Sequence, residues 1–294
     1  MKKIIALLFF LSVGIITTVC AQGIAKDTVP KKDTTKLEKL VQTIIKDTTP
    51  RKETKRDTIL EKKLEKHFYG VRQFGHETYL FLATPTRWHK ADWLRVGVTL
   101  AGTAALMPFD MRLTNTTQGQ QRYYYSVPVV GGRMYGEWYS IGIVTAAFGG
   151  YGILAHDTAA KKISIELLQA GAYSELFTEI MKILIGRARP YENLGPYTYH
   201  PFTLTNTGFQ SSPSGHATSA FALSTVMSRH AHSTFLKILA YVPAGFTLFS
   251  RIYQDYHWAS DEFFGAAVGL ATGSWVVTLH EGKRHKINIP VDSK

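Results

Sequence analysis

The sequence contains a single cysteine, Cys20, among its 294 residues, so it cannot form an intramolecular disulfide. It contains no metal-ligand motif and no Walker-type phosphate loop, and almost none of it alternates with the two-residue period of a half-buried strand. Its net charge of +12 would suit a nucleic-acid partner, but no basic stripe is interleaved with aromatic residues. These absences argue against a disulfide scaffold, a strand-rich fold and nucleic-acid binding.

Much of the positive charge lies outside the apolar part of the chain. Residues 22–66 carry thirteen Lys/Arg against eight Asp/Glu, and Lys2 and Lys3 add two further positive charges. Residues 67–294 therefore hold a net charge of +5. Several of these cations stand in three short blocks described below, so the excess charge indicates an anion site and a solvated tail.

The first 66 residues have the composition of an export signal followed by a linker. A positive start, an apolar run at 4–19 and Val19-Cys20-Ala21 before Gln22 predict a signal peptide over residues 1–21. A retained membrane anchor is the alternative, whereas the bulky Val19 disfavours a lipid anchor on Cys20. Residues 22–66 repeat Lys-Asp-Thr or Arg-Asp-Thr and have few apolar groups to bury, so they predict a disordered linker.

A helical domain is predicted over residues 67–285, followed by a tail at 286–294. Apolar stretches with helical spacing lie at about 92–108, 137–155, 163–186, 216–228, 235–250 and 262–280. They predict an all-α bundle of about six core helices. The longer connections are expected at 109–136, 191–212 and 251–261.

The sequence leaves open whether this bundle is embedded in a membrane, associated with one, or soluble. The apolar stretches of roughly 16–24 residues approach span length, and their frequent Gly and Ala favour a membrane. Positive residues lie at the ends of the helices opposite the three blocks described below, which would place these blocks outside the cytoplasm. If residue 22 is exported and three spans follow it, however, the blocks would lie inside the cytoplasm. The conflict disappears if one early helix does not span the membrane, or if the whole bundle is secreted and soluble. In both cases the site faces the periplasm, so we expect a cell-envelope protein with a periplasmic site.

The first of the three blocks is Lys182-Ile-Leu-Ile-Gly-Arg-Ala-Arg189-Pro190. Lys182 and Arg189 are seven residues apart, which places both on one face of a helix, and Pro190 should end that helix at Arg189. An Arg fork and a Lys point charge both suit phosphate. Arg187 lies off this face and is predicted to be a surface or loop cation.

The second block is Pro213-Ser214-Gly215-His216, which directly precedes an apolar run. This position predicts a helix N-terminus, where free N–H groups and the dipole attract an anion. Gly215 permits close backbone approach, Ser214 can cap the helix or bond an oxyanion, and His216 stands on the first turn. Taken alone, this block is better explained by an ordinary cap followed by a solvated histidine.

The third block runs from Ser250-Arg251 to His257 and Asp261. A spacing of four makes His257 and Asp261 neighbours on a helix, where the carboxylate can take the Nδ1 proton and leave Nε2 free to attack. Arg251 would complete a cage of cations, and Asp255 is expected to lie in a turn. His200, in the 191–212 connection, is a weaker candidate because a loop histidine is usually only solvated.

Together the blocks resemble the signature K-x6-R-P, P-S-G-H and S-R-x5-H-x3-D of the phosphatidic acid phosphatase type 2 superfamily, which includes bacterial acid phosphatases and vanadium haloperoxidases. The resemblance covers about residues 90–280. It implies that His257 attacks phosphorus, that Asp261 orients it, and that His216 protonates the leaving group and later activates water. It also implies a reaction without a divalent metal and a phosphoryl cage made by Lys182, Arg189, Arg251, Ser214 and the Gly215 N–H.

The function expected from the sequence is therefore that of a metal-independent phosphatase without a cofactor. The expected partners are a membrane and a phosphorylated lipid or a small phosphomonoester, and the substrate group is a phosphomonoester or pyrophosphate. Vanadate would act as a phosphate mimic. Two alternatives stay open: a vanadium haloperoxidase, in which vanadate is the cofactor, and a non-catalytic envelope protein.

Overall fold

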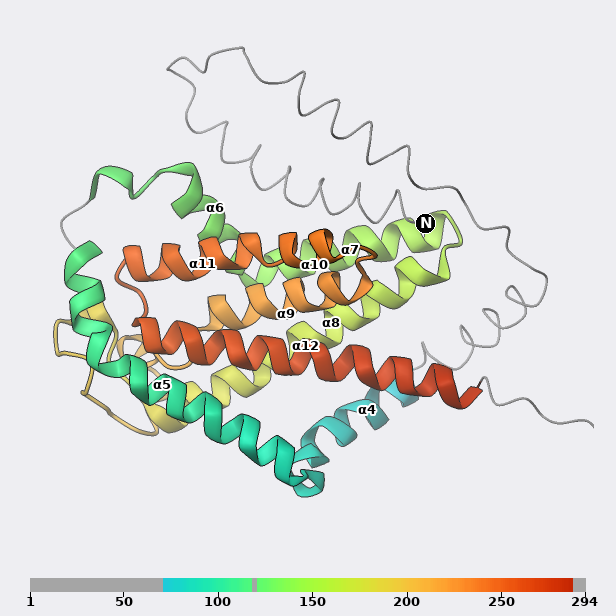
Figure 1. Ribbon diagram of the computed structural model, residues 1–294, viewed down its shortest axis with the longest axis horizontal. Helices are drawn as coiled ribbons and strands as arrows, with labels where there is room; N and C mark the ends of the chain where they lie inside the picture. Colours follow the sequence, from blue (N-terminus) through green and yellow to red (C-terminus); the bar gives the residue numbers. More distant parts are fainter. Residues whose placement is uncertain (1–70, 118–120, 288–294) are drawn as a thin grey trace, which may run out of the picture.

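The computed structural model describes residues 71–117 and 121–287 and shows a bundle of helices (Figure 1). Within these residues there is no strand, and the only β contact is an isolated bridge between Arg187 and Tyr199. The all-α prediction is confirmed. The predicted signal peptide (1–21), the predicted linker (22–66) and residues 288–294 of the predicted tail lie outside the described residues.

The α-helices of the described residues are α4 (Val71–Ala83), α5 (Lys90–Thr117), α6 (Val127–Gly136), α7 (Trp138–Leu154), α8 (Thr158–Ile185), α9 (Gly215–His230), α10 (Thr234–Leu239), α11 (Val242–Tyr253) and α12 (Ala259–Ile287). Short 3-10 helices lie at Thr84–Arg87, Gln121–Tyr123, Pro190–Glu192 and Thr207–Phe209. Helix α9 lies in the middle of the bundle and packs against α12, α8 and α11. The long helix α5 crosses α12 on its outer side (Figure 1).

The apolar core is formed by side chains from α7, α8, α9 and α12. Phe148, Leu167, Leu223 and Val276 are each at most 2% exposed and belong to one contiguous cluster. Full burial of a side chain of this size contributes about 1.5–3 kcal/mol relative to exposure. This core holds α8, α9 and α12 in fixed relation, and these helices carry Lys182, His216 and Asp261.

Glycines on α12 allow it to approach α9 very closely. A Cβ atom added at Gly265 would stand 2.4 Å from the carbonyl oxygen of Ser214, and one added at Gly269 would stand 2.3 Å from the carbonyl oxygen of Thr218. Small residues spaced four apart along one helix face permit such contacts. The start of α9 is thereby held against the first turns of α12.

The predicted connection at 109–136 is mostly helical, which corrects the sequence analysis. Helix α5 continues through Pro108 to Thr117, and α6 follows after Ser126. The Gly131-Gly132 pair suggested a loop, but Gly132 serves helix packing, because a Cβ there would lie 2.2 Å from the carbonyl oxygen of Phe246 on α11. The sequence analysis also does not predict α4.

A second, polar contact joins the helices at the end of the bundle remote from the three blocks. His280 on α12 lies between two buried carboxylates, with Nδ1 3.1 Å from Glu166 on α8 and Nε2 3.2 Å from Glu77 on α4. Glu166 also bonds His230 of α9 and pairs with Lys162 at 3.4 Å. Burial opposes ionisation, but the bonds to His230 and His280 lower the pKa of Glu166 to about 2.

Two stretches of the described residues are long and apolar enough to cross a membrane, as judged by length and composition. They are Thr234–Tyr253, which covers α10 and α11, and Ala259–Glu281 in α12. Large apolar side chains also remain exposed over several helices, among them Leu94, Leu154 and Phe235. An apolar surface of this kind agrees with the predicted membrane-associated fold.

Candidate active site

The two motif histidines come together at the start of α9 and just before α12. The rings of His216 and His257 have centroids 6.1 Å apart and planes inclined by 59°. His216 stands on the first turn of α9, and His257 lies in the bend between α11 and α12. At this separation both rings can contact one tetrahedral group, since reacting groups lie about 3 Å from their partners in such sites.

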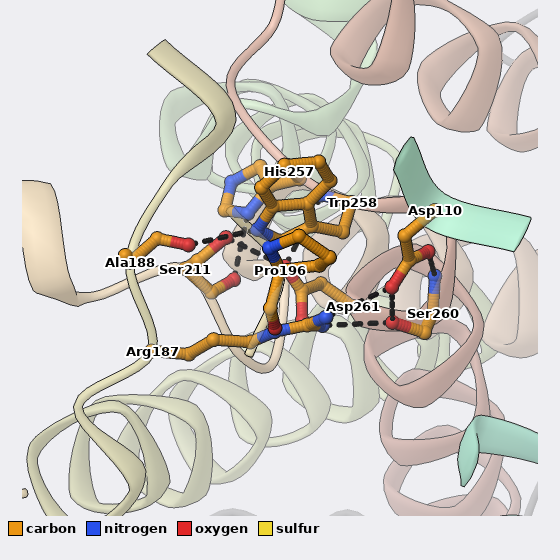
Figure 2. Close-up of polar contacts among 9 residues, drawn as sticks. All are labelled: Asp110, Arg187, Ala188, Pro196, Ser211, His257, Trp258, Ser260 and Asp261. Carbon is orange, nitrogen blue, oxygen red and sulfur yellow. Dashed lines mark hydrogen bonds and ion pairs between the residues drawn. The ribbon is translucent and has the colours of Figure 1, made fainter. Parts of the chain in front are cut away.

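His257 is buried and hydrogen-bonded in a way that fixes its tautomer. Its Nδ1 lies 2.7 Å from the main-chain carbonyl oxygen of Ser211, and the residue is 1% exposed (Figure 2). A carbonyl oxygen only accepts, so Nδ1 donates and the lone pair of the neutral ring is on Nε2. Burial first, and then the charges of Arg189 and its neighbours, lower the pKa of His257 well below its ordinary value. The ring is thus neutral at physiological pH, with a free lone pair on Nε2.

The predicted direct contact between Asp261 and His257 Nδ1 is wrong, because the Ser211 carbonyl occupies that place. His257 precedes α12, which begins at Ala259, so the two residues do not share a helix face. Asp261 Oδ2 instead accepts from the Ser211 hydroxyl at 2.5 Å and from the Trp258 N–H at 3.1 Å (Figure 2). The carboxylate therefore holds the segment whose carbonyl holds His257.

Arg187 is not a surface cation, contrary to the sequence analysis. It is 2% exposed and donates to Asp261 Oδ1 at 2.5 Å and to Asp110 Oδ2 at 2.8 Å (Figure 2). Burial opposes its charge, but the two carboxylates raise the pKa of the guanidinium above its usual value. The inward turn follows from Gly186, whose φ of 60° ends α8 four residues before Pro190.

The sequence analysis also misses residues that complete this buried network. Ser260 donates to Asp110 Oδ2 at 2.5 Å and accepts from Arg187 at 2.7 Å, and the Arg187 Nε donates to the Pro196 carbonyl at 2.9 Å. The Trp258 indole N–H donates to the Ala188 carbonyl at 2.8 Å. One signal was available: Asp110 is a lone carboxylate in the apolar run Met107-Pro-Phe-Asp-Met111.

The three predicted cage cations surround the histidines from three different elements. Arg251 is on the last turn of α11 and is 1% exposed, with its guanidinium 4.3 Å from the Tyr256 ring centroid. Arg189 follows α8 and faces the same ring at 5.8 Å. Since α8 ends at Ile185, Lys182 and Arg189 do not share a helix face as predicted.

Lys182 reaches the start of α9 from the last turn of α8. Its Nζ would lie 3.2 Å from a Cβ added at Gly215, and it donates to Glu179 at 2.6 Å. Ser214 caps α9, as predicted, because its hydroxyl oxygen accepts from the Ala217 N–H at 3.3 Å. The Lys182 ammonium and the helix N-terminus therefore present positive charge at the same place.

His216 has a carboxylate neighbour that the sequence analysis does not predict. Its Nε2 lies 3.3 Å from Oε1 of Glu137, the residue between α6 and α7. Burial, Arg251 and Lys182 lower the pKa of His216, while Glu137 opposes them. The bond to His216 in turn lowers the pKa of Glu137.

The two remaining candidates lie where the sequence analysis expects them. His200 is exposed in the 191–212 connection and packs on Phe209, with ring centroids 4.2 Å apart. Asp255 lies in the turn after α11 with φ of 58°. Neither residue joins the two histidines in the described structure.

Residues 164–285 match the family model described as the PAP2 superfamily. The match covers less than half of the chain, and this part is similar to the PAP2 superfamily. The match begins within α8 and ends within α12, so it contains all three blocks but not α4 to α7. Glu137 and Asp110 therefore reach the matched region from the part of the chain that precedes it.

Two known proteins are similar to this chain. A lipid A 1-phosphatase of Porphyromonas gingivalis is 37% identical over 92 residues, which are 30% of this chain and 21% of that protein. The match thus spans about a fifth of the relative's length. The crystal structure of a transmembrane PAP2 type phosphatidylglycerolphosphate phosphatase from Bacillus subtilis aligns with a TM-score of 0.49 at 20% identity, over 64% of this chain and 94% of that one.

Proposed function

We propose that this protein is a phosphatase that removes phosphate from a phosphorylated lipid through a phosphohistidine formed at His257. The observation that carries the proposal is the 6.1 Å separation of the ring centroids of His216 and the neutral, hydrogen-bonded His257, beside three cations that act on His257. The PAP2 match and the similarity to a lipid A 1-phosphatase support the same reaction class. A phosphomonoester and a pyrophosphate both present the group that this site would bind.

The cage residues would hold the three non-bridging oxygens of the phosphoryl group. Arg189 and Arg251 supply guanidinium donors, Lys182 supplies a point charge, and the start of α9 supplies the Gly215 N–H, beside the capping Ser214. Fixed donors of this kind stabilise the charge that develops on the equatorial oxygens during transfer. In this proposal they do the work that divalent metals do in other phosphatases.

The reaction would proceed in two displacements. His257 Nε2 donates its lone pair to phosphorus while the bond from phosphorus to the leaving oxygen breaks, and protonated His216 gives its proton to that oxygen. In the second step, His216 takes a proton from water, the oxygen of that water attacks phosphorus, and the P–N bond breaks. Inorganic phosphate leaves, and both histidines return to their starting protonation.

We infer that the substrate reaches the site from a membrane surface. The exposed apolar side chains of α5, α7 and α10 suit contact with lipid, while the cations gather where α9 and α12 begin. A lipid headgroup would lie at this end of the bundle with its chains along the helices. The charge bias of the connections supports a site on the periplasmic side.

Phosphate release by the detergent-purified full chain tests the proposal. A panel of phosphatidate, an isoprenoid pyrophosphate, a lipid A phosphate and a soluble ester should show release that persists with chelator and is inhibited by vanadate. His257→Ala should abolish release and the acid-labile phosphoprotein, whereas His76→Ala, which removes an exposed histidine on α4, should change neither. A His257→Ala protein with wild-type turnover would refute the proposal, and vanadate-dependent halide oxidation without phosphate release would favour the haloperoxidase alternative.

A further inference from the structure

Glu137 lies outside the three motif blocks and yet faces one of the two histidines. It occupies the junction between α6 and α7, with Oε1 3.3 Å from Nε2 of His216. The junction is packed directly against α9, because a Cβ at Gly136 would stand 3.0 Å from the Cβ of His216 and 2.8 Å from its carbonyl oxygen. Backbone packing therefore holds the carboxylate beside the ring.

The other charged groups around His216 repel a proton from its ring. They are Lys182 on α8, Arg251 on α11 and Arg133 on α6, which lies near Glu137, while the ring of His257 before α12 is neutral. The N-terminal position on α9 adds the positive end of the helix dipole. Among the described residues, Glu137 is the one carboxylate within ion-pair distance of the ring. A general acid needs its proton at working pH, so this negative charge offsets the field of the cage.

The contact also decides which nitrogen of His216 is left for the substrate. Nε2 lies within ion-pair distance of Glu137 and is itself buried without a hydrogen bond, and no described residue hydrogen-bonds Nδ1. The side chains of His216 and Glu137 are 22% and 28% exposed, so the pair is partly accessible. After Nδ1 has given up its proton, the Nε2–H stays beside the carboxylate and the Nδ1 lone pair is ready to take a proton from water.

We propose that Glu137 is a positioning residue that strengthens the hold of His216 on its proton and turns its Nδ1 toward the leaving-group oxygen. The proposal rests on the phosphatase function proposed above and adds a residue from the α6–α7 junction to that site. The effect of Glu137 on the rate should depend on the leaving group of the substrate. An alkyl or lipid alcohol is a poor leaving group and needs the proton, whereas p-nitrophenolate leaves without one. Glu137 should therefore matter for the first kind of substrate and not for the second.

The test compares Glu137→Gln with wild type on an alkyl phosphate and on p-nitrophenyl phosphate. General acid catalysis contributes about 10²–10⁴-fold, and loss of its charge partner should remove about 10- to 100-fold of kcat/KM for the alkyl ester. The value for p-nitrophenyl phosphate should change less than about threefold, since little protonation is needed. The alkaline limb of the alkyl-ester profile should move to lower pH, because His216 without Glu137 loses its proton more readily. Glu137→Asp should restore part of the rate, and Glu281→Gln, at the far end of α12, should leave all values unchanged.

The outcomes separate this proposal from the proposed function. Equal losses on both substrates with an unmoved alkaline limb would mean a structural role for Glu137 and would overturn the proposal. Wild-type values in Glu137→Gln, with His216→Ala impaired, would overturn it as well and leave the phosphatase function intact. If the wild-type protein releases no phosphate from either ester, both the role of Glu137 and the phosphatase function are refuted.

Discussion

The Nδ1 atom of His257 lies 2.7 Å from the main-chain carbonyl oxygen of Ser211, and the hydroxyl of the same serine lies 2.5 Å from Asp261. Asp261 is thus connected to His257 through one intervening residue. The serine holds the imidazole with its backbone and is itself held by its side chain. This arrangement makes Ser211, which belongs to none of the three blocks, part of the support of His257.

Ser211→Ala should lower kcat/KM about tenfold, which corresponds to ~1.4 kcal/mol of transition-state stabilisation. The carbonyl remains in the variant, but the hydrogen bond that fixes it to Asp261 is lost. Ser174→Ala is a matched control, since that buried hydroxyl bonds only the Gly171 carbonyl within α8. Steady-state kinetics on both variants decide the point: unchanged kcat/KM in Ser211→Ala would show that Asp261 does not act through the serine.

The depressed pKa of His257 predicts how activity and stability depend on pH. The acid limb of kcat/KM should lie below about pH 6.5, the ordinary histidine value, because the neutral ring is the reactive form. The unfolded chain binds the proton more readily, so stability should fall as pH drops below about 6.5 and keep falling to the folded pKa.

Thermal unfolding at several pH values, together with a pH–rate profile, measures both effects. His257→Asn should unfold with a weaker dependence on pH between about 5 and 7, because the titrating group is absent. An acid limb at or above pH 6.5 in the wild-type profile would contradict the burial and the positive surroundings of the ring.

The close contact of α9 and α12 predicts that Gly265→Ala is damaging. The added Cβ would stand 2.4 Å from the Ser214 carbonyl, so the two helix starts must separate. We expect a loss of about 1–3 kcal/mol in unfolding free energy, typical of overpacking, and reduced kcat as His216 moves from His257. Gly245→Ala on α11 is the control, because nothing lies within 4 Å of its Cβ position. Equal stability and activity of the two variants would refute the contact.

The remote polar cluster predicts that His280→Ala destabilises the fold without directly altering the chemistry. The buried carboxylates of Glu77 and Glu166 would lose the ring that lies between them, and breaking a buried pair costs about 3–5 kcal/mol. Glu281→Gln removes an exposed ion pair with Arg229 one residue away and should cost less than about 1 kcal/mol. Chemical denaturation measures the difference, and kcat of folded protein at low temperature should stay close to wild type.

The sequence predicts well those features that depend on neighbours along the chain. The periodicity gives the helices that became α7, α8, α9 and α12, and the Ser214-Gly215 pair correctly marks the start of α9. Prediction from the sequence fails where one local pattern is compatible with two structures. Gly131-Gly132 suggests a turn, but Gly132 is the point where α11 touches α6. Gly186 ends α8 before Pro190 can act.

Contacts between distant parts of the chain are the larger omission. Arg187 looks like a spare cation until Asp110, 77 residues earlier, is seen to pair with it. Glu137 has no spacing relation to His216 that a pattern could reveal. A motif names the groups that react, whereas the groups that hold them come from wherever the fold brings a carboxylate or a carbonyl within reach.

The cluster around Glu166 has a consequence for how the molecule can move. Helices α8, α9 and α12 each have one end in the site, at Lys182, His216 and Asp261, and the other end in the cluster, at Glu166, His230 and His280. A lengthwise slip of any of them by one turn, ~5.4 Å, would break charged contacts at both extremities. Axial register is thereby locked, so any change in the site on substrate binding is expected in the connecting segments and side chains and not in sliding of these helices.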